Sequence, residues 1–182
     1  VVALNAGANN SAASSFFLPL DRIERALREL QKDAPVTRGT LQTTFRSEPY
    51  DELPRLGLTD ESERVARETF PKQTGMLTVA QVIPGSLASE LLAPGDILIR
   101  VNGDLITKFV PLEAILDSHV GKEIEIQVER GGKRIVANVR VDDLHAITPD
   151  EYLEFGDGIV NQLSYQQARH YNRQPEGVYV AN

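Results

Sequence analysis

The sequence lacks cysteine and tryptophan among its 182 residues, and aromatic side chains make up only 6% of it. Without cysteine the chain has no disulfide, no zinc site built on thiolates and no cysteine nucleophile. Its longest apolar runs are a few residues, far below the ~20 that a bilayer-spanning helix needs, and no targeting segment is evident. These absences predict an ordinary globular protein, and they favour a reducing intracellular compartment.

Positive charge is also scarce, because 19 Lys and Arg stand against 26 Asp and Glu and give a net charge of −7. A nucleic-acid surface needs clustered Lys and Arg, and the sequence contains no basic stripe, so we expect no nucleic-acid partner. The histidines His119, His145 and His170 lack the spacing of a metal-binding pair. We predict no metal, no cofactor and no catalytic residue in this chain.

Both ends of the chain have the composition of strands. Val1–Leu4 is apolar and has no preceding Met, and the last residues before Asn182 are again β-prone. Domains rarely begin and end inside strands, so we expect a piece of a longer protein. Residues 5–15 are small and polar, which predicts a loop.

A helix is predicted next. Asp21 and Glu24 have the spacing of a capping box. Apolar residues recur on one helical face, and Pro35 marks the end of this first region. The face consists of Leu20, Ile23, Leu27 and Leu30.

The middle of the chain, about residues 38–141, has the pattern of a small strand-rich module. Alternating apolar residues at 97–101, 124–128 and 135–141 predict strands, and Asn102-Gly103 predicts a tight turn. We also predict a short helix ended by Gly57, a charged helix or insertion at 59–69, and a helix that Pro111 opens. The fold class is α+β and mostly β, a partly open barrel or sandwich with two or three helices.

The run L-A-P-G-D-I-L-I-R-V-N-G at residues 92–103 resembles the most recognisable stretch of PDZ domains in HtrA/Deg serine proteases. V-A-L-N-A-G at 2–7 and F-F-L-P-L-D-R at 16–22 resemble the end of the trypsin-like domain of that family. R-G-T-L-Q at 38–42, D-L-H-A-I-T-P-D at 143–150 and L-S-Y-Q-Q-A-R at 163–169 resemble the long tandem Deg proteases of fungi and plants.

This resemblance implies three parts. Residues 1–35 would be the end of a trypsin-like domain, and residues 36–142 a PDZ domain with a charged helical insertion near 59–73. Residues 143–182 would be a linker and the truncated start of a second PDZ-like domain. The parent would be a serine endopeptidase of the nucleus or chloroplast. Its His, Asp and Ser triad would precede Val1, and no G-N-S-G loop occurs here, so we expect this fragment to be inactive.

PDZ domains hold a peptide's terminal carboxylate in a loop of backbone N–H groups and add the peptide to a sheet as a strand. By resemblance that loop is Thr40-Leu41-Gln42-Thr43, although the family favours Gly where Gln42 stands and an aliphatic residue where Thr43 stands. Arg38 would assist an anionic terminus. Alternatively, this segment is a plain edge strand and Arg38 a solvated hinge residue. The opposite wall would be Leu112, Ile115 and Leu116; alternatively, two of these three residues belong to the core.

Asn5, Ala6 and Gly7 match the strand that lines the substrate channel of the protease. Our first functional hypothesis is a PDZ module that recruits peptide C-termini or unfolded segments, or that regulates its own protease. The second is an interaction domain without a peptide ligand, which organises homo-oligomers or neighbouring repeats. A third, an autonomous hydrolase, predicts turnover that we do not expect.

Overall fold

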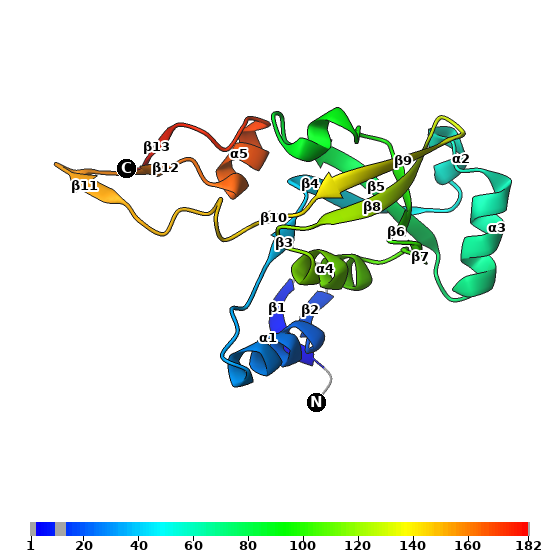
Figure 1. The fold of residues 1–182 in the computed structure, drawn as a ribbon, viewed down its shortest axis with the longest axis horizontal. Coiled ribbons are helices and arrows are strands. Elements are labelled where there is room, and N and C mark those ends of the chain that lie inside the picture. The colour runs from blue at the N-terminus through cyan, green and yellow to red at the C-terminus, as the bar shows by residue number, and fades with distance from the viewer. Residues whose placement is uncertain (1–2, 10–13, 182) are drawn as a thin grey trace. The chain divides into compact units, whose positions relative to one another are not determined.

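The computed structural model describes residues 3–9 and 14–181, with side chains from Leu20 onward (Figure 1). The chain divides into two units, Val1–Val36 and Thr37–Asn182, and each is described by itself. Within the described part, none of the helices combines the length and the apolar character that crossing a membrane requires.

The first unit contains two antiparallel strands and a helix: β1 (Ala3–Asn9), β2 (Ser14–Pro19) and α1 (Asp21–Gln31). The predicted loop at 5–15 is therefore wrong in its described part, because pairing of the two strands overrides the loop preference of small polar residues. Val1, Val2 and residues 10–13 lie outside the described residues.

Helix α1 is confirmed, but its predicted capping box is wrong. Leu20 occupies the N-cap without a side-chain hydrogen bond, and Asp21 and Glu24 lie in the first turn, where acidic groups complement the helix dipole. Arg28 donates to Glu24 over 3.0 Å. The apolar face of α1 is exposed, with Leu27 at 53% and Leu30 at 65%.

The second unit is built on a six-stranded antiparallel sheet in which the strands follow the order β4-β5-β6-β8-β9, with β7 paired to β6. A separate pair, β10 with β3, brings residues 142–143 back beside residues 39–40. These open antiparallel sheets confirm the mixed, mostly β class. Their bounds are β3 Gly39–Thr40, β4 Thr43–Pro49, β5 Gly75–Val82, β6 Ile97–Val101, β7 Asp104–Leu105, β8 Glu123–Arg130, β9 Lys133–Arg140 and β10 Asp142–Asp143.

Local sequence explains most of these strands. In β8, Ile124, Ile126 and Val128 are buried while Glu123 and Glu125 are exposed, which is the period-2 pattern of a sheet with one buried face. The predicted tight turn joins β6 to β7. Asn102 and Gly103 have φ values of 50° and 85°, as a two-residue hairpin turn requires.

Four short helices surround the sheet: α2 (Leu53–Leu56), α3 (Asp60–Thr69), the 3₁₀ turn η1 (Leu87–Glu90) and α4 (Phe109–Ser118). Gly57 ends α2 in the left-handed conformation with φ of 100°, as predicted. Helix α4 begins at Phe109 rather than at Pro111, because proline is tolerated anywhere in the first turn, where its missing N–H has no partner to lose.

The charged helix α3 is anchored on the sheet by a buried carboxylate. Glu129 is 1% exposed, and it accepts hydrogen bonds from the Thr59 N–H at 2.9 Å, the Thr59 hydroxyl at 3.0 Å and the Ser62 hydroxyl at 2.6 Å. These donors belong to the N-cap and first turn of α3, so the Glu129 carboxylate fixes this end of the helix to the sheet.

Two hydrophobic clusters hold the domain together. The larger one lies between the sheet and α4 and includes Leu77, Leu98, Leu116, Ile126 and Val139. The smaller one packs α2 and α3 against the other side of β5 and β6 through residues such as Leu53, Ala66 and Met76. The structure therefore holds α4 firmly in place beside the sheet.

After β10 the chain forms a second, smaller sheet in the order β11-β12-β13. Its elements are β11 (Leu153–Phe155), β12 (Gly158–Gln162), helix α5 (Tyr165–Tyr171) and β13 (Val178–Ala181). The β-prone end of the sequence forms β13, whereas the β11–β12 hairpin was not predicted. Leu153, Phe155, Val178 and Val180 are all more than 60% exposed, so one apolar face of this sheet is uncovered.

Candidate binding groove

A groove of about 230 Å³ runs between the edge strand β4 and helix α4. It begins at the loop that joins β3 to β4, and the C-terminal part of the chain closes one side of it. Its lining consists of Arg38, Gly39, Thr40, Leu41, Thr43, Thr44, Phe45, Phe109, Leu112, Glu113, Leu116, Asp117, Leu144, Tyr165 and Arg169.

The loop at the end of the groove has a left-handed backbone conformation at its bend, although the residue there is not glycine. Gln42 has φ of 52°, a left-handed value that favours glycine. Its side chain turns away, with Nε2 donating to Asp142 Oδ2 at 2.9 Å, and it does not line the groove. The bulk of Gln42 is thus accommodated outside the groove.

Two backbone donors of this loop differ in their partners. The Gln42 N–H donates to the Thr40 hydroxyl at 2.9 Å. The Leu41 N–H has no acceptor among the described residues. Thr43 donates through its hydroxyl to the Leu41 carbonyl at 3.1 Å. Among the described residues, the Leu41 N–H is therefore unused, whereas the Gln42 N–H is already bonded within the loop.

Asp117 fastens the loop to α4. Its carboxylate accepts from the Gly39 N–H at 2.9 Å and pairs with Arg38 Nη1 at 3.2 Å, and its backbone carbonyl accepts from the Thr37 hydroxyl at 2.6 Å. Asp117 is only 4% exposed. Sequence reasoning missed this residue, although an acidic side chain in the last turn of a helix opposes the dipole and signals a specific contact.

Gly39 allows the loop to lie directly on α4. A Cβ at this position would fall 2.1 Å from the Leu116 carbonyl oxygen, far inside van der Waals contact. The approach of the β3 backbone to the C-terminal end of α4 therefore requires a residue without a side chain.

The predicted apolar residues of the loop and of the opposite wall separate into two groups. Leu41, Leu112 and Leu116 are each at most 7% exposed and line the groove. Ile115 does not line it, and instead faces a different open hollow with Phe70 and other residues. The structure also adds Phe45 and Phe109, two aromatic groove residues that the sequence did not single out.

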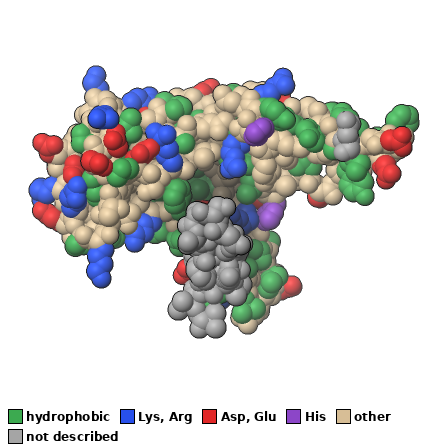
Figure 2. All heavy atoms as spheres, turned by 180° about the vertical axis from the view of Figure 1, so that it is seen from behind, with side chains coloured by type: hydrophobic (Ala, Val, Ile, Leu, Met, Phe, Trp, Pro, Cys, Tyr) green, Lys and Arg blue, Asp and Glu red, His purple; other side chains and the backbone are tan. Residues whose placement is uncertain are grey.

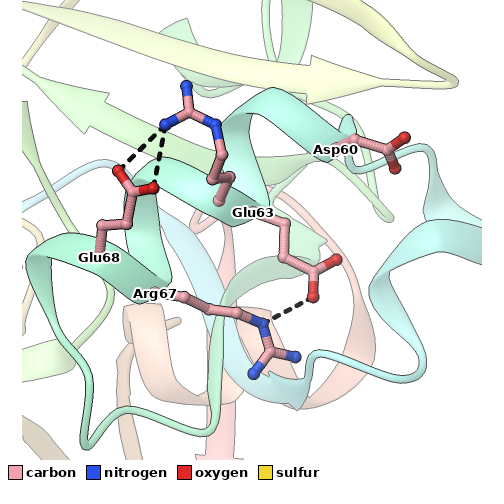
Figure 3. A pocket seen from close by; sticks show the side chains of 5 residues that line it. Asp60, Glu63, Arg67 and Glu68 are labelled. Atoms are coloured by element: carbon pink, nitrogen blue, oxygen red, sulfur yellow. Dashed lines mark hydrogen bonds and ion pairs between the residues drawn. The ribbon is translucent and has the colours of Figure 1, made fainter.

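The other hollows are less suited to binding a ligand. One of about 540 Å³ lies on the exposed surface of α3 and is lined only by side chains of that helix. There Arg64 pairs with Glu68 at 3.0 Å and Arg67 with Glu63 at 2.7 Å (Figure 3). Such exposed i,i+4 pairs are solvated and contribute little. Figure 2 shows basic and acidic side chains interspersed at this end of the molecule rather than gathered by sign.

Asn5, Ala6 and Gly7 lie in β1, at an irregularity of the pairing between Asn5 and Gly7, and their side chains are outside the description. Across the residues whose structure is described, no cluster of three or more His, Asp or Glu side chains is suited to holding a metal ion.

The family comparisons agree with this geometry. A profile of the PDZ domain matches residues 78–130, and a profile described as a PDZ-like domain matches residues 146–182. Protease Do-like 7 of Arabidopsis thaliana is 49% identical over 193 residues, which cover 100% of this chain and 18% of the relative. The homologues of the present chain are Deg/HtrA-like proteases. The fungal protease NMA111 of Debaryomyces hansenii is 45% identical over 179 residues, covering 98% of this chain and 18% of the relative.

The chain thus spans about a fifth of these Deg/HtrA-like relatives, and the resemblance inferred from the sequence is confirmed. Solved HtrA-type proteases share the fold. AlgW with a decapeptide has a TM-score of 0.53 at 17% identity, covering 79% of this chain and 42% of that one. AlgW with a tripeptide has a TM-score of 0.50 at 19% identity, covering 79% of this chain and 45% of that one.

Proposed function

We propose that the groove between β4 and α4 binds peptide, and that the domain is the substrate-recruiting or regulatory PDZ module of a Deg/HtrA-type serine endopeptidase. The observation that carries the proposal is the position of β4. It is the edge strand of its sheet, and the apolar residues Leu41, Leu112 and Leu116 lie beside it. An extended peptide can therefore pair with β4 and place side chains between β4 and α4.

The end of the groove supports recognition of a C-terminus. The Leu41 N–H is without an acceptor among the described residues, and a curled loop of backbone donors is a typical anion site. Buried leucines beside this loop favour an aliphatic last residue, because apolar contact stabilises by about 25 cal/mol per Å² buried. We therefore expect ligands that end in Val, Leu or Ile with a free carboxylate.

The test is a titration of this 182-residue chain with twenty labelled decapeptides that differ only in the last residue, followed by fluorescence anisotropy. Saturable binding of the aliphatic members is expected. Leu41→Asp should abolish it, with circular dichroism to check the fold, since Leu41 is 2% exposed. Phe109→Asp is a gentler second variant, because Phe109 lines the groove but is 41% exposed.

Leu87→Asp is the matched control, since Leu87 is 54% exposed and does not line the groove. The proposal fails if none of the twenty peptides binds, or if Leu87→Asp weakens binding as much as Phe109→Asp does.

A second candidate is an interaction domain that organises oligomers or neighbouring repeats without a peptide ligand. The exposed apolar residues of the β11-β12-β13 sheet, among them Phe155 at 81%, favour it. Light scattering after size-exclusion chromatography distinguishes the two. A stable oligomer that Phe155→Ser converts to monomer, together with no peptide binding, would support this candidate.

A further inference from the structure

We propose that Arg169 of helix α5 binds the terminal carboxylate of a peptide in the β4–α4 groove, so that the PDZ-like segment completes the site of the domain that precedes it. This inference rests on the proposed peptide-binding function. It adds a specificity-determining residue that lies outside the residues matched as a PDZ domain, within the segment at 146–182.

Helix α5 is held against the domain by specific contacts. Gln81 on β5 donates through Nε2 to the Arg169 carbonyl at 2.9 Å and to Asn172 Oδ1 at 3.1 Å. Gln174 packs on Gly85, where a Cβ would fall 1.9 Å from its Nε2. These contacts span the far end of α5 and the chain after it.

The start of α5 is equally well defined. Ser164 and Gln167 form a reciprocal capping box, and the Tyr165 N–H donates to the Ile147 carbonyl at 3.3 Å. Tyr165 is 7% exposed and Ala168 is fully buried. The helix therefore presents Tyr165 and Arg169, which are one turn apart, to the groove.

One backbone donor of this loop is already used, so a cation beside the loop would add a further partner for an anion. The Gln42 N–H is used by the Thr40 hydroxyl, which leaves the Leu41 N–H and the Thr43 N–H on the free edge of β4. Arg38 is paired with Asp117. In the described part of the chain, Arg169 makes no side-chain ion pair, and it is the other basic residue of the groove lining.

Two acidic residues, Glu113 and Asp117, also line the groove, and their positions determine at which end a peptide carboxylate is favoured. Asp117 is engaged by Arg38 and the Gly39 N–H. Glu113 lies one helical turn toward the start of α4, about 6 Å farther from the loop by the helical rise. A carboxylate is therefore favoured at the loop end, where Arg169 can receive it in the bidentate geometry of guanidinium–carboxylate pairs.

The experiment compares the tightest decapeptide of the aliphatic series as free acid and as C-terminal amide. We expect Arg169→Gln to weaken binding of the free acid about tenfold or more, the size expected for a hydrogen-bonded charge pair, and to leave the weaker binding of the amide unchanged. Arg169→Lys should restore part of the loss. The salt dependence of free-acid binding should be smaller in Arg169→Gln than in the parent chain.

Arg173→Gln is the matched control, because Arg173 is an exposed basic residue of the same segment that does not line the groove, and it should bind both peptides as the parent does. Unchanged free-acid affinity in Arg169→Gln overturns the inference while the peptide-binding function stands. Equal losses for acid and amide would also overturn it, because they indicate that Arg169 only packs α5. If the parent chain binds no peptide, both proposals fail.

Discussion

The contact between Asp117 and the loop at the end of the groove should determine both stability and peptide affinity. The perturbation is Asp117→Ala, with Asp117→Asn as the conservative variant. The side chain is 4% exposed and binds the Gly39 N–H at 2.9 Å and Arg38 Nη1 at 3.2 Å. Hydrogen bonds to a charged group contribute about 1.5–3 kcal/mol each, and the share of Arg38 is smaller because its side chain is 29% exposed.

Asp117→Ala should therefore lower the free energy of unfolding by about 3–4 kcal/mol. Asp117→Asn should lower it by only about 1 kcal/mol, because the amide oxygen still accepts from Gly39 while the ion pair is lost. Urea unfolding at pH 7 measures both values, and the slopes should match the parent if the folded state is otherwise unchanged.

Peptide affinity supplies the second readout. Released from α4, the loop should no longer position the Leu41 N–H, and folded Asp117→Ala should bind the free-acid peptide at least tenfold more weakly. A variant within 0.5 kcal/mol of the parent would refute the energetic reasoning. A destabilised variant whose folded fraction binds normally would refute the link between this contact and the groove.

Three further outcomes follow from other parts of the domain. Glu129→Ala removes the three hydrogen bonds that anchor α3. It should lower the free energy of unfolding in urea by about 3–5 kcal/mol and leave peptide affinity unchanged. A loss of peptide binding would contradict this prediction. Gly39→Ala should abolish peptide binding even if the domain still folds, because the new Cβ overlaps the α4 backbone; normal binding would show that the loop can move away. Tyr50→Phe should raise the free energy of unfolding in urea by up to about 1 kcal/mol, because the buried hydroxyl of Tyr50 has no partner among the described residues. A lower free energy of unfolding would show that the hydroxyl has a hydrogen-bond partner.

Tyr50 also predicts a pH dependence. Burial raises the pKa of the Tyr50 hydroxyl, against the opposing effect of Arg67. The Tyr50 hydroxyl therefore ionises at lower pH in the unfolded chain than in the folded one, starting at about pH 10. The contribution of Tyr50 to the free energy of unfolding should be complete below this pH and should fall as the pH rises through the folded-state pKa. In Tyr50→Phe this part of the alkaline loss should disappear, and an identical alkaline profile would contradict the assignment.

Features that depend on near neighbours in the sequence could be predicted. The β8–β9 hairpin follows from strict alternation around Gly131-Gly132, and the β6–β7 turn follows from Asn102-Gly103. The end of α2 follows from Gly57. Each of these depends on residues within about ten positions, which is the range where periodicity and turn preferences are informative.

Features that depend on distant contacts could not be predicted. Asp117 reaches Gly39 across 78 positions, and Glu129 reaches Thr59 across 70. The placement of α5 depends on Gln81, which lies 88 positions before Arg169. The small polar composition of residues 5–9 likewise predicted a loop where β1 pairs with β2. The groove could be anticipated through its leucines, but the polar contacts that shape it required the structure.

Binding of peptide between β4 and α4 can be observed residue by residue. The measurement is amide chemical-shift mapping of the labelled 182-residue chain with the tightest free-acid decapeptide. We predict that the largest shifts occur at Leu41, Thr43 and Phe45 along the loop and β4, and at Leu112 and Leu116 on α4. Shifts confined to the β11-β12-β13 sheet or to α3, with none along β4, would contradict peptide binding in this groove.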